Sequence, residues 1–153
     1  MAIVGRALTF HKKAQFQVLI DGFTSAAFSK MSALECEIAE IKYYEGGTLI
    51  PNKSLGRMEF KDLTLERGAC SDVDAYAWFS MGAVAPANVG LKDSAYKRHM
   101  EVIQADRDGE VVRRWTIFNA FVKGFTAGEW DNNADEVVIE KMVIAYDWFQ
   151  RTL

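Results

Sequence analysis

The clearest pattern near the start of the sequence is an alternation of apolar and mostly polar side chains. In residues 14–21, Phe16, Val18 and Ile20 fall on one side of this alternation, and Gly22 follows directly. Successive side chains of a strand point to opposite faces, so a period of two is typical of a half-buried strand. The pattern predicts such a strand, which ends at Gly22.

The next segments are patterned less clearly. Residues 34–43 fit a helix or a strand by pattern alone, and we interpret them as a strand. Residues 48–56 follow a Glu-Gly-Gly sequence and contain Pro51 and Asn52, a composition typical of turns. We therefore expect a long surface loop at 48–56 and a strand that resumes at 57–67.

One short helix is expected over residues 71–81. Ser71 or Asp72 can cap its first turn, acidic residues suit its positive N-terminal end, and Gly82 can terminate it. Apolar side chains recur at spacings of three and four, which predicts a stripe that packs on a sheet. The stripe comprises Val73, Tyr76, Ala77, Phe79 and Met81.

The strongest local signal is a β-hairpin in the second half of the chain. Residues 97–105 and 110–123 are alternating runs that flank the sequence Asp-Arg-Asp-Gly at 106–109. Asp-Gly between alternating runs is typical of a hairpin turn, because the glycine accepts the positive φ that such turns require. The sequence therefore predicts two antiparallel strands joined at 106–109.

The C-terminal run has apolar side chains on both of its faces. It covers residues 136–149 and follows an expected loop at 124–134. A strand with two apolar faces must be covered twice, once by its own core and once by another surface. We therefore expect a neighbouring subunit to cover one face. The residues assigned to this contact are Val138, Met142, Val143, Ile144 and Tyr146.

Composition narrows the class of protein. The 153 residues are 50% hydrophobic and 25% charged, and no repeat or linker interrupts them, so we expect one globular domain over 1–153. The net charge of -3 argues against a general attraction to nucleic-acid phosphates. Apolar stretches are too short for a membrane helix, and the N-terminus lacks the order of a secretory signal, so we expect synthesis in the cytoplasm.

Residues that carry catalytic or metal chemistry do not form a recognisable constellation in the sequence. His11 and His99 lack the spacing of metal ligands, and Cys36 and Cys70 form no CxxC pair. We expect two buried thiols, no catalytic residues, no cofactor and no metal. Glu35 and Glu37 share a strand face, but two acids at this spacing are more often solvated charge than an acid-base pair.

An ordered set of local signatures resembles the inner tube protein of contractile phage tails and of related contractile injection systems. Each signature is weak alone, and their order along the chain makes the resemblance specific. They are FQVLIDG at 16–22, FSKMSAL at 28–34, IKYYEGG at 41–47, LTLERG at 63–68, WF at 78–79, WTIFNA at 115–120, EVVIE at 136–140 and MVIAY at 142–146.

The resemblance implies a mainly β fold, an antiparallel β-barrel or sandwich with one short flanking α-helix. This is an Hcp-like tail tube fold, similar in fold more than in motif to the type VI secretion tube protein. It also implies homohexameric rings, stacked into a hollow tube that conducts DNA without binding it specifically. The implied partners are further copies of the chain, the sheath, the baseplate and the tail terminator. Such a subunit belongs to a virion tail assembled in the host cytoplasm, with no membrane binding.

The resemblance assigns roles to two parts of the chain and constrains residues 1–13 least. Those residues precede the first signature, and we expect them to form an N-terminal arm, either an ordered subunit contact or a loose segment. A loop that reaches toward the adjacent ring comprises Thr48, Leu49, Ile50, Pro51 and Asn52. The tube lumen is lined by Glu35, Glu37 and Glu40, because an acidic lining repels the phosphate backbone of passing DNA.

Two other functions compete with a phage tail tube. The first alternative is the inner tube of a non-viral extracellular contractile injection system, which carries protein cargo. The second is a monomeric ligand-binding β-barrel, which would hide its apolar faces within one chain and therefore fits the C-terminal run less well. The sequence gives no support to an enzyme.

Overall fold

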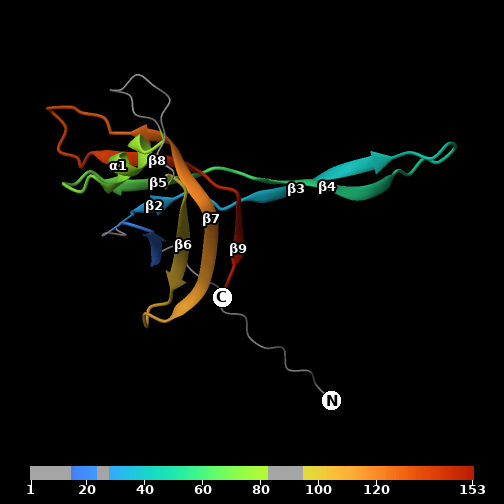
Figure 1. Cartoon of the computed structure of the whole chain (residues 1–153), viewed down its shortest axis with the longest axis horizontal. Coiled ribbons are helices and arrows are strands. Elements are labelled where there is room, and N and C mark those ends of the chain that lie inside the picture. Colours follow the sequence, from blue (N-terminus) through green and yellow to red (C-terminus); the bar gives the residue numbers. More distant parts are fainter. Residues whose placement is uncertain (1–14, 24–27, 83–94) are drawn as a thin grey trace, which may run out of the picture.

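The chain folds mainly into antiparallel β-strands (Figure 1). The computed structural model describes residues 15–23, 28–82 and 95–153, so the expected N-terminal arm at 1–13 lies outside the described residues. The elements in order are β1 (Phe16–Ile20), β2 (Lys30–Met31), β3 (Cys36–Tyr43), β4 (Asn52–Phe60), β5 (Leu63–Gly68), α1 (Asp74–Ser80), β6 (Arg98–Ala105), β7 (Val111–Thr126), β8 (Ile139–Ala145) and β9 (Trp148–Arg151).

Seven strands form one sheet that folds over itself into a sandwich and does not close into a barrel. The order is β1-β6-β7-β8-β5-β2, with β9 paired to β7. The first part of β7 pairs with β6 and β9, and its last part pairs with β8. Strand β7 is therefore shared by two layers, β1-β6-β7-β9 and β7-β8-β5-β2, whose strands cross at a steep angle (Figure 1).

The corner between the layers lies at Asn119 in the middle of β7. Its backbone φ is 54°, which a non-glycine residue adopts rarely and which asparagine tolerates better than most. Asn119 Nδ2 donates a hydrogen bond of 2.8 Å to Asp147 Oδ2, and Asp147 N donates one of 3.1 Å to the carbonyl of Phe118. Asp147 lies between β8 and β9, so the chain turns from one layer to the other at the same corner where β7 bends.

The core lies between the two layers and is closed at one end by α1. Trp78 of α1 is 1% exposed, and its indole N–H donates a hydrogen bond of 2.8 Å to the carbonyl of Tyr96. The side chains buried in this core are Val18, Ile20, Phe28, Leu63, Leu65, Ala75, Trp78, Met100, Val102, Ile117, Ala120, Val122, Met142 and Ile144.

Several predictions of local structure are confirmed. Strand β1 buries Val18 and Ile20 as the alternation predicts, and residues 36–43 form a strand and not a helix. The predicted hairpin is the pair β6 and β7. Asp106 Oδ1 accepts hydrogen bonds from the backbone of Asp108 and Glu110 in its turn, and Gly109 has a φ of 83°.

The helix differs from its prediction in its cap and in its buried face. Val73 occupies the N-cap and forms no side-chain cap, so neither Ser71 nor Asp72 has that role. Val73 and Tyr76 of the predicted stripe are exposed, whereas Ala75 and Trp78 are buried. The helix has only seven residues, almost all apolar, so spacing alone does not select the face that packs.

Three predicted boundaries are also wrong. Residues 52–56 belong to β4, so only residues 48–51 of the expected loop lie in the turn between β3 and β4. The strand expected at 57–67 is divided between β4 and β5. The C-terminal run is two strands, β8 and β9, in different layers, and the expected loop at 124–134 begins after β7 ends at Thr126. Strand β4 makes its ladder on the surface, where no burial imposes an alternating pattern.

Candidate functional site

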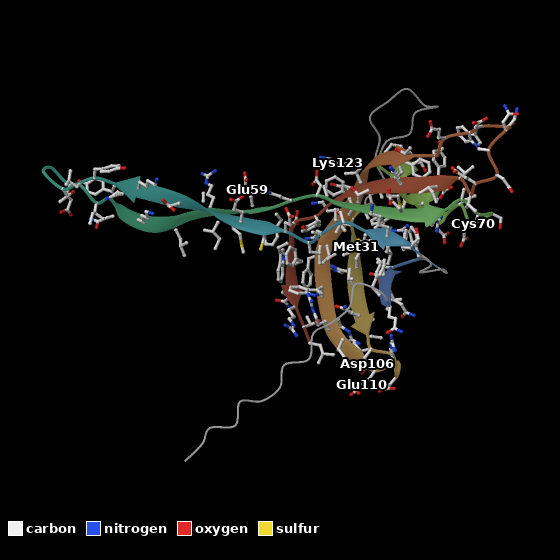
Figure 2. The ribbon with its side chains drawn as sticks, turned by 180° about the vertical axis from the view of Figure 1, so that it is seen from behind. Met31, Glu59, Cys70, Asp106, Glu110 and Lys123 are labelled. Atoms are coloured by element: carbon white, nitrogen blue, oxygen red, sulfur yellow. The ribbon has the colours of Figure 1, made fainter. Side chains whose placement is uncertain are left out.

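The β3–β4 hairpin projects from the sandwich as a separate two-stranded arm (Figures 1 and 2). Its register runs from the Cys36–Phe60 pair at the base to the Tyr43–Asn52 pair near the tip. Every residue of β3 is exposed. Edge strands in monomeric proteins are usually protected from pairing or contact by charge and shortness, so a long uncovered hairpin is suited to contact with another surface.

Apolar side chains occupy both faces of the hairpin and its tip. Leu49 and Ile50 at the tip are 97% and 81% exposed, and Leu55 in β4 is 76% exposed. Other large apolar side chains exposed along the hairpin are Ile38, Ile41, Tyr43, Tyr44 and Met58. The predicted inter-ring residues 48–52 therefore lie together at the tip, and sequence analysis missed the apolar surface behind them. The sequence signal that could have revealed this surface is the presence of apolar residues on both faces of the strand at 36–43.

The predicted lumen-facing acids are separated by the structure into two places. Lys61 Nζ lies 3.6 Å from Glu35 and 4.0 Å from Glu37, so these two carboxylates share one lysine at the base of the hairpin. Glu59, which pairs with Glu37 in register, points outward from the hairpin in Figure 2. Glu40 lies among Lys42 and Lys53, at 3.7 Å and 3.8 Å. Strand alternation places Glu40 on the opposite face from Glu37.

Tyr146 attaches the base of the hairpin to the sandwich. Its hydroxyl donates a hydrogen bond of 2.7 Å to the carbonyl of Lys61, and its ring lies edge-on to Phe60. The pKa of Tyr146 is raised to about 12, chiefly by burial and also by the nearby Cys36, Asp62 and Glu35. Tyr146 thus contacts its own chain, although it was predicted to contact a neighbour.

The C-terminal residues assigned to an intersubunit contact do not form one surface. Met142 and Ile144 are 2% and 0% exposed in the core of the chain itself, so they are not available to a neighbour. This corrects the prediction for both, because β8 turns alternate side chains inward. Of the five assigned residues, Val138, Val143 and Tyr146 remain partly exposed. Cys36 and Cys70 are exposed free thiols, contrary to the expected burial.

The layer β1-β6-β7-β9 has two free edges. In the described part of the chain β1 pairs with β6 alone, and β9 pairs with β7 alone. Each edge therefore presents backbone N–H and C=O groups that another strand can bond. The two edges lie on opposite sides of the layer, so they are suited to head-to-tail addition of copies.

Within residues 15–23, 28–82 and 95–153, no three side chains of the types that ligate metals lie close enough to hold an ion. In the same ranges, no helix has the length and apolar character to cross a membrane. The features that stand out are surfaces for contact: an arm, a tip and two sheet edges.

Comparison with solved structures identifies the fold as that of tube proteins. A chain of the anti-feeding prophage cap (AFP tube terminating cap) superposes with a TM-score of 0.81 at 20% identity, covering 99% of each chain. A chain of an extracellular contractile injection system, the PVC sheath-tube complex in its extended state, gives 0.76 at 18% identity, covering 93% of this chain and 90% of the other. Hcp1 from Flavobacterium johnsoniae gives 0.59 at 10% identity, covering 90% and 94%. No curated protein sequence matches the chain.

The chain is a tail tube protein by fold and by sequence family. The family model described as T4-like virus tail tube protein gp19 matches residues 12–150. The chain belongs to this family. Its membership confirms the resemblance and makes the chain a structural component of a phage tail or a related contractile particle.

Proposed function

We propose that the chain is the non-enzymatic subunit of an inner tail tube, in which homohexameric rings stack into a hollow conduit. The observation that carries this proposal is the four-stranded layer with a free edge on each side. Pairing of β9 in one copy with β1 in the next removes both edges, and head-to-tail contacts that complete a rotation close a ring. The 1–153 chain acts as one domain in this assembly.

The projecting hairpin supplies the contact between rings. Its tip residues Thr48, Leu49, Ile50, Pro51 and Asn52 stand clear of the sandwich and reach toward the adjacent ring. Val138 and Val143, which are partly exposed, remain candidates for contact within a ring. Burial of the apolar hairpin surface is the main source of free energy for stacking.

The tube conducts phage DNA into a host cell. The chain carries a net charge of -3, and an acidic lumen repels phosphates, so the genome passes without binding. Glu35 and Glu37 remain the proposed lumen-facing residues, and the lysine that they share reduces their local charge. Glu40 was assigned to the same lining, but it lies on the opposite face of β3 from Glu37, so we do not group it with them. The subunit is made in the host cytoplasm and becomes part of the virion.

Protein cargo is the second candidate function. The PVC sheath-tube complex belongs to an extracellular contractile injection system, and its tube fold is shared with this chain. In either particle the partners of the tube are its own copies, a surrounding sheath, a baseplate and a terminator. The related structures titled AFP baseplate and PVC sheath/tube terminator support these partner classes.

Negative-stain electron microscopy of the concentrated, purified protein tests the assembly. We expect hollow six-fold rings viewed end-on and striated tubes viewed from the side. Adding tail lysate provides a template if the pure protein stays monomeric. A chain that stays monomeric at high concentration and is absent from every tailed particle would contradict the proposal. Double-stranded DNA recovered from intact particles would favour the phage tube over the particle that carries protein.

A further inference from the structure

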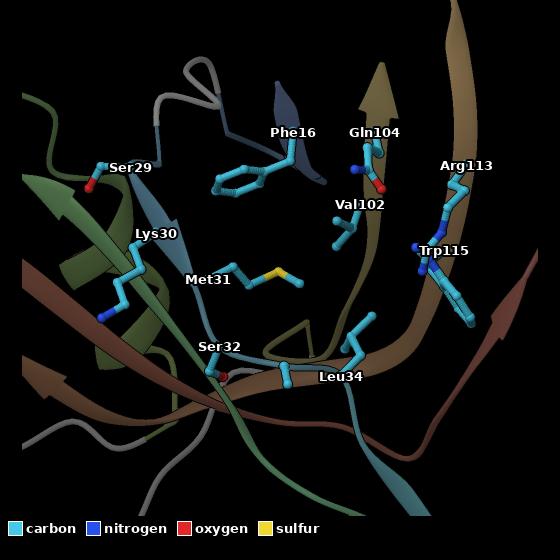
Figure 3. Close-up of a pocket in the computed structure, with 11 residues that line it drawn as sticks. Phe16, Ser29, Lys30, Met31, Ser32, Leu34, Val102, Gln104, Arg113 and Trp115 are labelled. Atoms are coloured by element: carbon cyan, nitrogen blue, oxygen red, sulfur yellow. The ribbon is translucent and has the colours of Figure 1, made fainter. Parts of the chain in front are cut away.

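A groove opens between the two strands that end the seven-stranded sheet, β1 and β2 (Figure 3). It has a volume of about 600 Å³, and its lining combines apolar side chains with the polar side chains of Ser29, Ser32 and Gln104. Phe16 and Met31 point into it from opposite sides in Figure 3. The apolar side chains that line it are Phe16, Met31, Ala33, Leu34, Val102 and Trp115. A groove of this size and character is suited to the apolar side chains of another chain.

The charged groups at the groove are cationic. Arg113 and Lys30 line it, and no carboxylate is among its lining residues. The Arg113 guanidinium lies over the ring of Trp115 at 5.2 Å, and its Nε is buried without a hydrogen-bond partner among the described residues. Lys30 lies 4.0 Å from Glu66, at the limit of an ion pair. A buried donor without an acceptor indicates a missing partner, and a carboxylate suits arginine best.

The tip of the β3–β4 hairpin has the complementary chemistry. Leu49 and Ile50 are the two most exposed large apolar side chains among the described residues. Glu45 stands beside them at the turn, where its backbone carbonyl accepts hydrogen bonds from Thr48. The Glu45 carboxylate accepts one long hydrogen bond of 3.5 Å from Asn52, so it has capacity for a cation.

The hairpin tip and the groove lie on opposite sides of the molecule. Figures 1 and 2 both show the hairpin extending away from the sandwich on one side, with β1 and β2 on the other. A tip therefore reaches the groove of a different copy and not its own. A contact between two different patches is head-to-tail, and its repetition stacks copies in one direction.

We propose that the groove between β1 and β2 receives the hairpin tip of a second copy in the adjacent ring. Leu49 and Ile50 enter between Phe16 and Met31, and the Glu45 carboxylate accepts a hydrogen bond from Arg113. This inference rests on the proposed stacking of rings, and it adds the receiving site and the charge pair. In this repeated contact the groove is the receiving surface and the hairpin tip is the inserted element.

Cysteine crosslinking in assembled tubes tests the contact. In a background with Cys36→Ser and Cys70→Ser, the pair Leu49→Cys and Met31→Cys is treated with a short bis-maleimide. We expect covalent dimers and a ladder of higher multimers on denaturing gels. The matched control pairs Leu49→Cys with Leu19→Cys, which is exposed on the outer face of β1 and should give no ladder.

Charge reversal tests the pair of Glu45 and Arg113. Glu45→Arg alone and Arg113→Glu alone should each raise the protein concentration needed for tube formation by roughly tenfold or more. The double variant restores the pair with reversed signs and should return that concentration close to the wild-type value. Because Glu45 is exposed on the turn, its variant also reports on the contact if Arg113→Glu fails to fold.

The outcomes distinguish this inference from the proposed function. If the cysteine variant assembles into tubes and the 49–31 pair fails to crosslink, the contact between groove and tip is wrong and the proposed tube function still stands. Tubes of Glu45→Arg that form at the wild-type concentration would lead to the same conclusion. If the wild-type chain forms no rings or tubes with any template, both the contact between groove and tip and the tube function are wrong.

Discussion

The sandwich and the β3–β4 hairpin use apolar residues in opposite ways. In the sandwich, large apolar side chains such as Leu65 and Ile144 are fully buried by their own chain. In the hairpin, side chains of the same type, such as Leu55 and Ile41, are exposed. Both regions are antiparallel and regular, so the difference lies in what covers them and not in their secondary structure.

The two regions are therefore stabilised by different contacts. The sandwich buries its apolar surface within one chain, and such burial contributes about 25 cal/mol per Å² to the free energy of folding. The hairpin gains little from its own chain beyond backbone pairing, and an isolated two-stranded hairpin is marginal in water. Mutations in the sandwich should therefore change folding, and mutations in the hairpin should change assembly.

The largest effect on folding is expected from Trp78→Ala. This change empties the end of the core and removes the hydrogen bond to the carbonyl of Tyr96. We expect the free energy of unfolding to fall by about 3–5 kcal/mol, measured by chemical denaturation. The matched control is Trp130→Ala, because Trp130 is 73% exposed and its loss should change stability by about 0.5 kcal/mol at most. Equal losses in both variants would contradict the assignment of the core.

The next effect is expected at the buried ion pair. Arg67 is 3% exposed, its Nε lies 3.3 Å from Glu140 Oε2, and its guanidinium lies 5.7 Å from the centre of the Phe28 ring. Glu140→Gln leaves that cation without its anion, so we expect a loss of about 3 kcal/mol in denaturant unfolding. Asp62→Asn breaks the exposed pair with Lys123 and should lose about 1 kcal/mol or less. A neutral result for Glu140→Gln would show that water or another group replaces the carboxylate.

Local signals in the sequence predicted the parts of the sandwich that obey short-range rules. The alternation of Phe16, Val18 and Ile20 predicted β1, because burial on one face imposes a period of two. The Asp-Gly turn predicted β6 and β7, because Gly109 has the positive φ that the turn demands. The ordered signatures predicted the family, which no single physical feature of the chain specifies.

Long-range pairing explains what the sequence could not predict. The C-terminal run divides at Asp147 because that residue meets Asn119, which is 28 positions away, and no local pattern contains this contact. The first half of strand β4, residues 52–56, was predicted as a loop, because Asn52 and Gly56 suit turns and an exposed strand shows no apolar alternation. The inter-ring role of residues 48–52 stays a prediction, whereas Met142 and Ile144 were assigned to a surface that the fold buries.

The pH dependence of stability tests how the hairpin base joins the sandwich. The pKa of Tyr146 is raised from 10.0 to about 12 in the folded chain, chiefly by burial. Its contribution to stability is therefore complete below pH 10 and is lost as the pH rises toward 12. We expect Tyr146→Phe to be less stable by about 1 kcal/mol near neutral pH, where the hydrogen bond to the carbonyl of Lys61 is missing.

The difference in free energy of unfolding between wild type and Tyr146→Phe should shrink between pH 10 and pH 12. Over this range the wild type loses the contribution of the Tyr146 hydroxyl, which the variant lacks at every pH. Denaturant unfolding at several pH values measures it. Tyr43→Phe, at an exposed site in the hairpin, should keep the wild-type dependence. If the difference in free energy of unfolding stayed constant between pH 10 and pH 12, burial at the base of the hairpin would not keep the Tyr146 hydroxyl protonated.

The smallest effect on folding, and a large effect on assembly, is expected from Leu55→Asp. Leu55 lies in β4 with 76% of its surface exposed, so the new carboxylate remains hydrated in the free subunit. We expect the free energy of unfolding to change by about 0.5 kcal/mol or less. In an assembled tube the same carboxylate would be buried against another copy without a partner, and burial of an unpaired charge is strongly unfavourable. Sedimentation and electron microscopy should therefore show folded subunits and no tubes.

Leu65→Asp provides the matched comparison, because it makes the same chemical change at a fully buried position in β5. This variant should fail to fold, because the carboxylate would be buried in the core without a cation to pair with it. If Leu55→Asp also unfolded, the hairpin would contribute to the stability of the free subunit. Its exposed apolar side chains would then not indicate an assembly surface. If Leu55→Asp formed normal tubes, this face of β4 would stay in water in the particle, and stacking would depend on the hairpin tip alone.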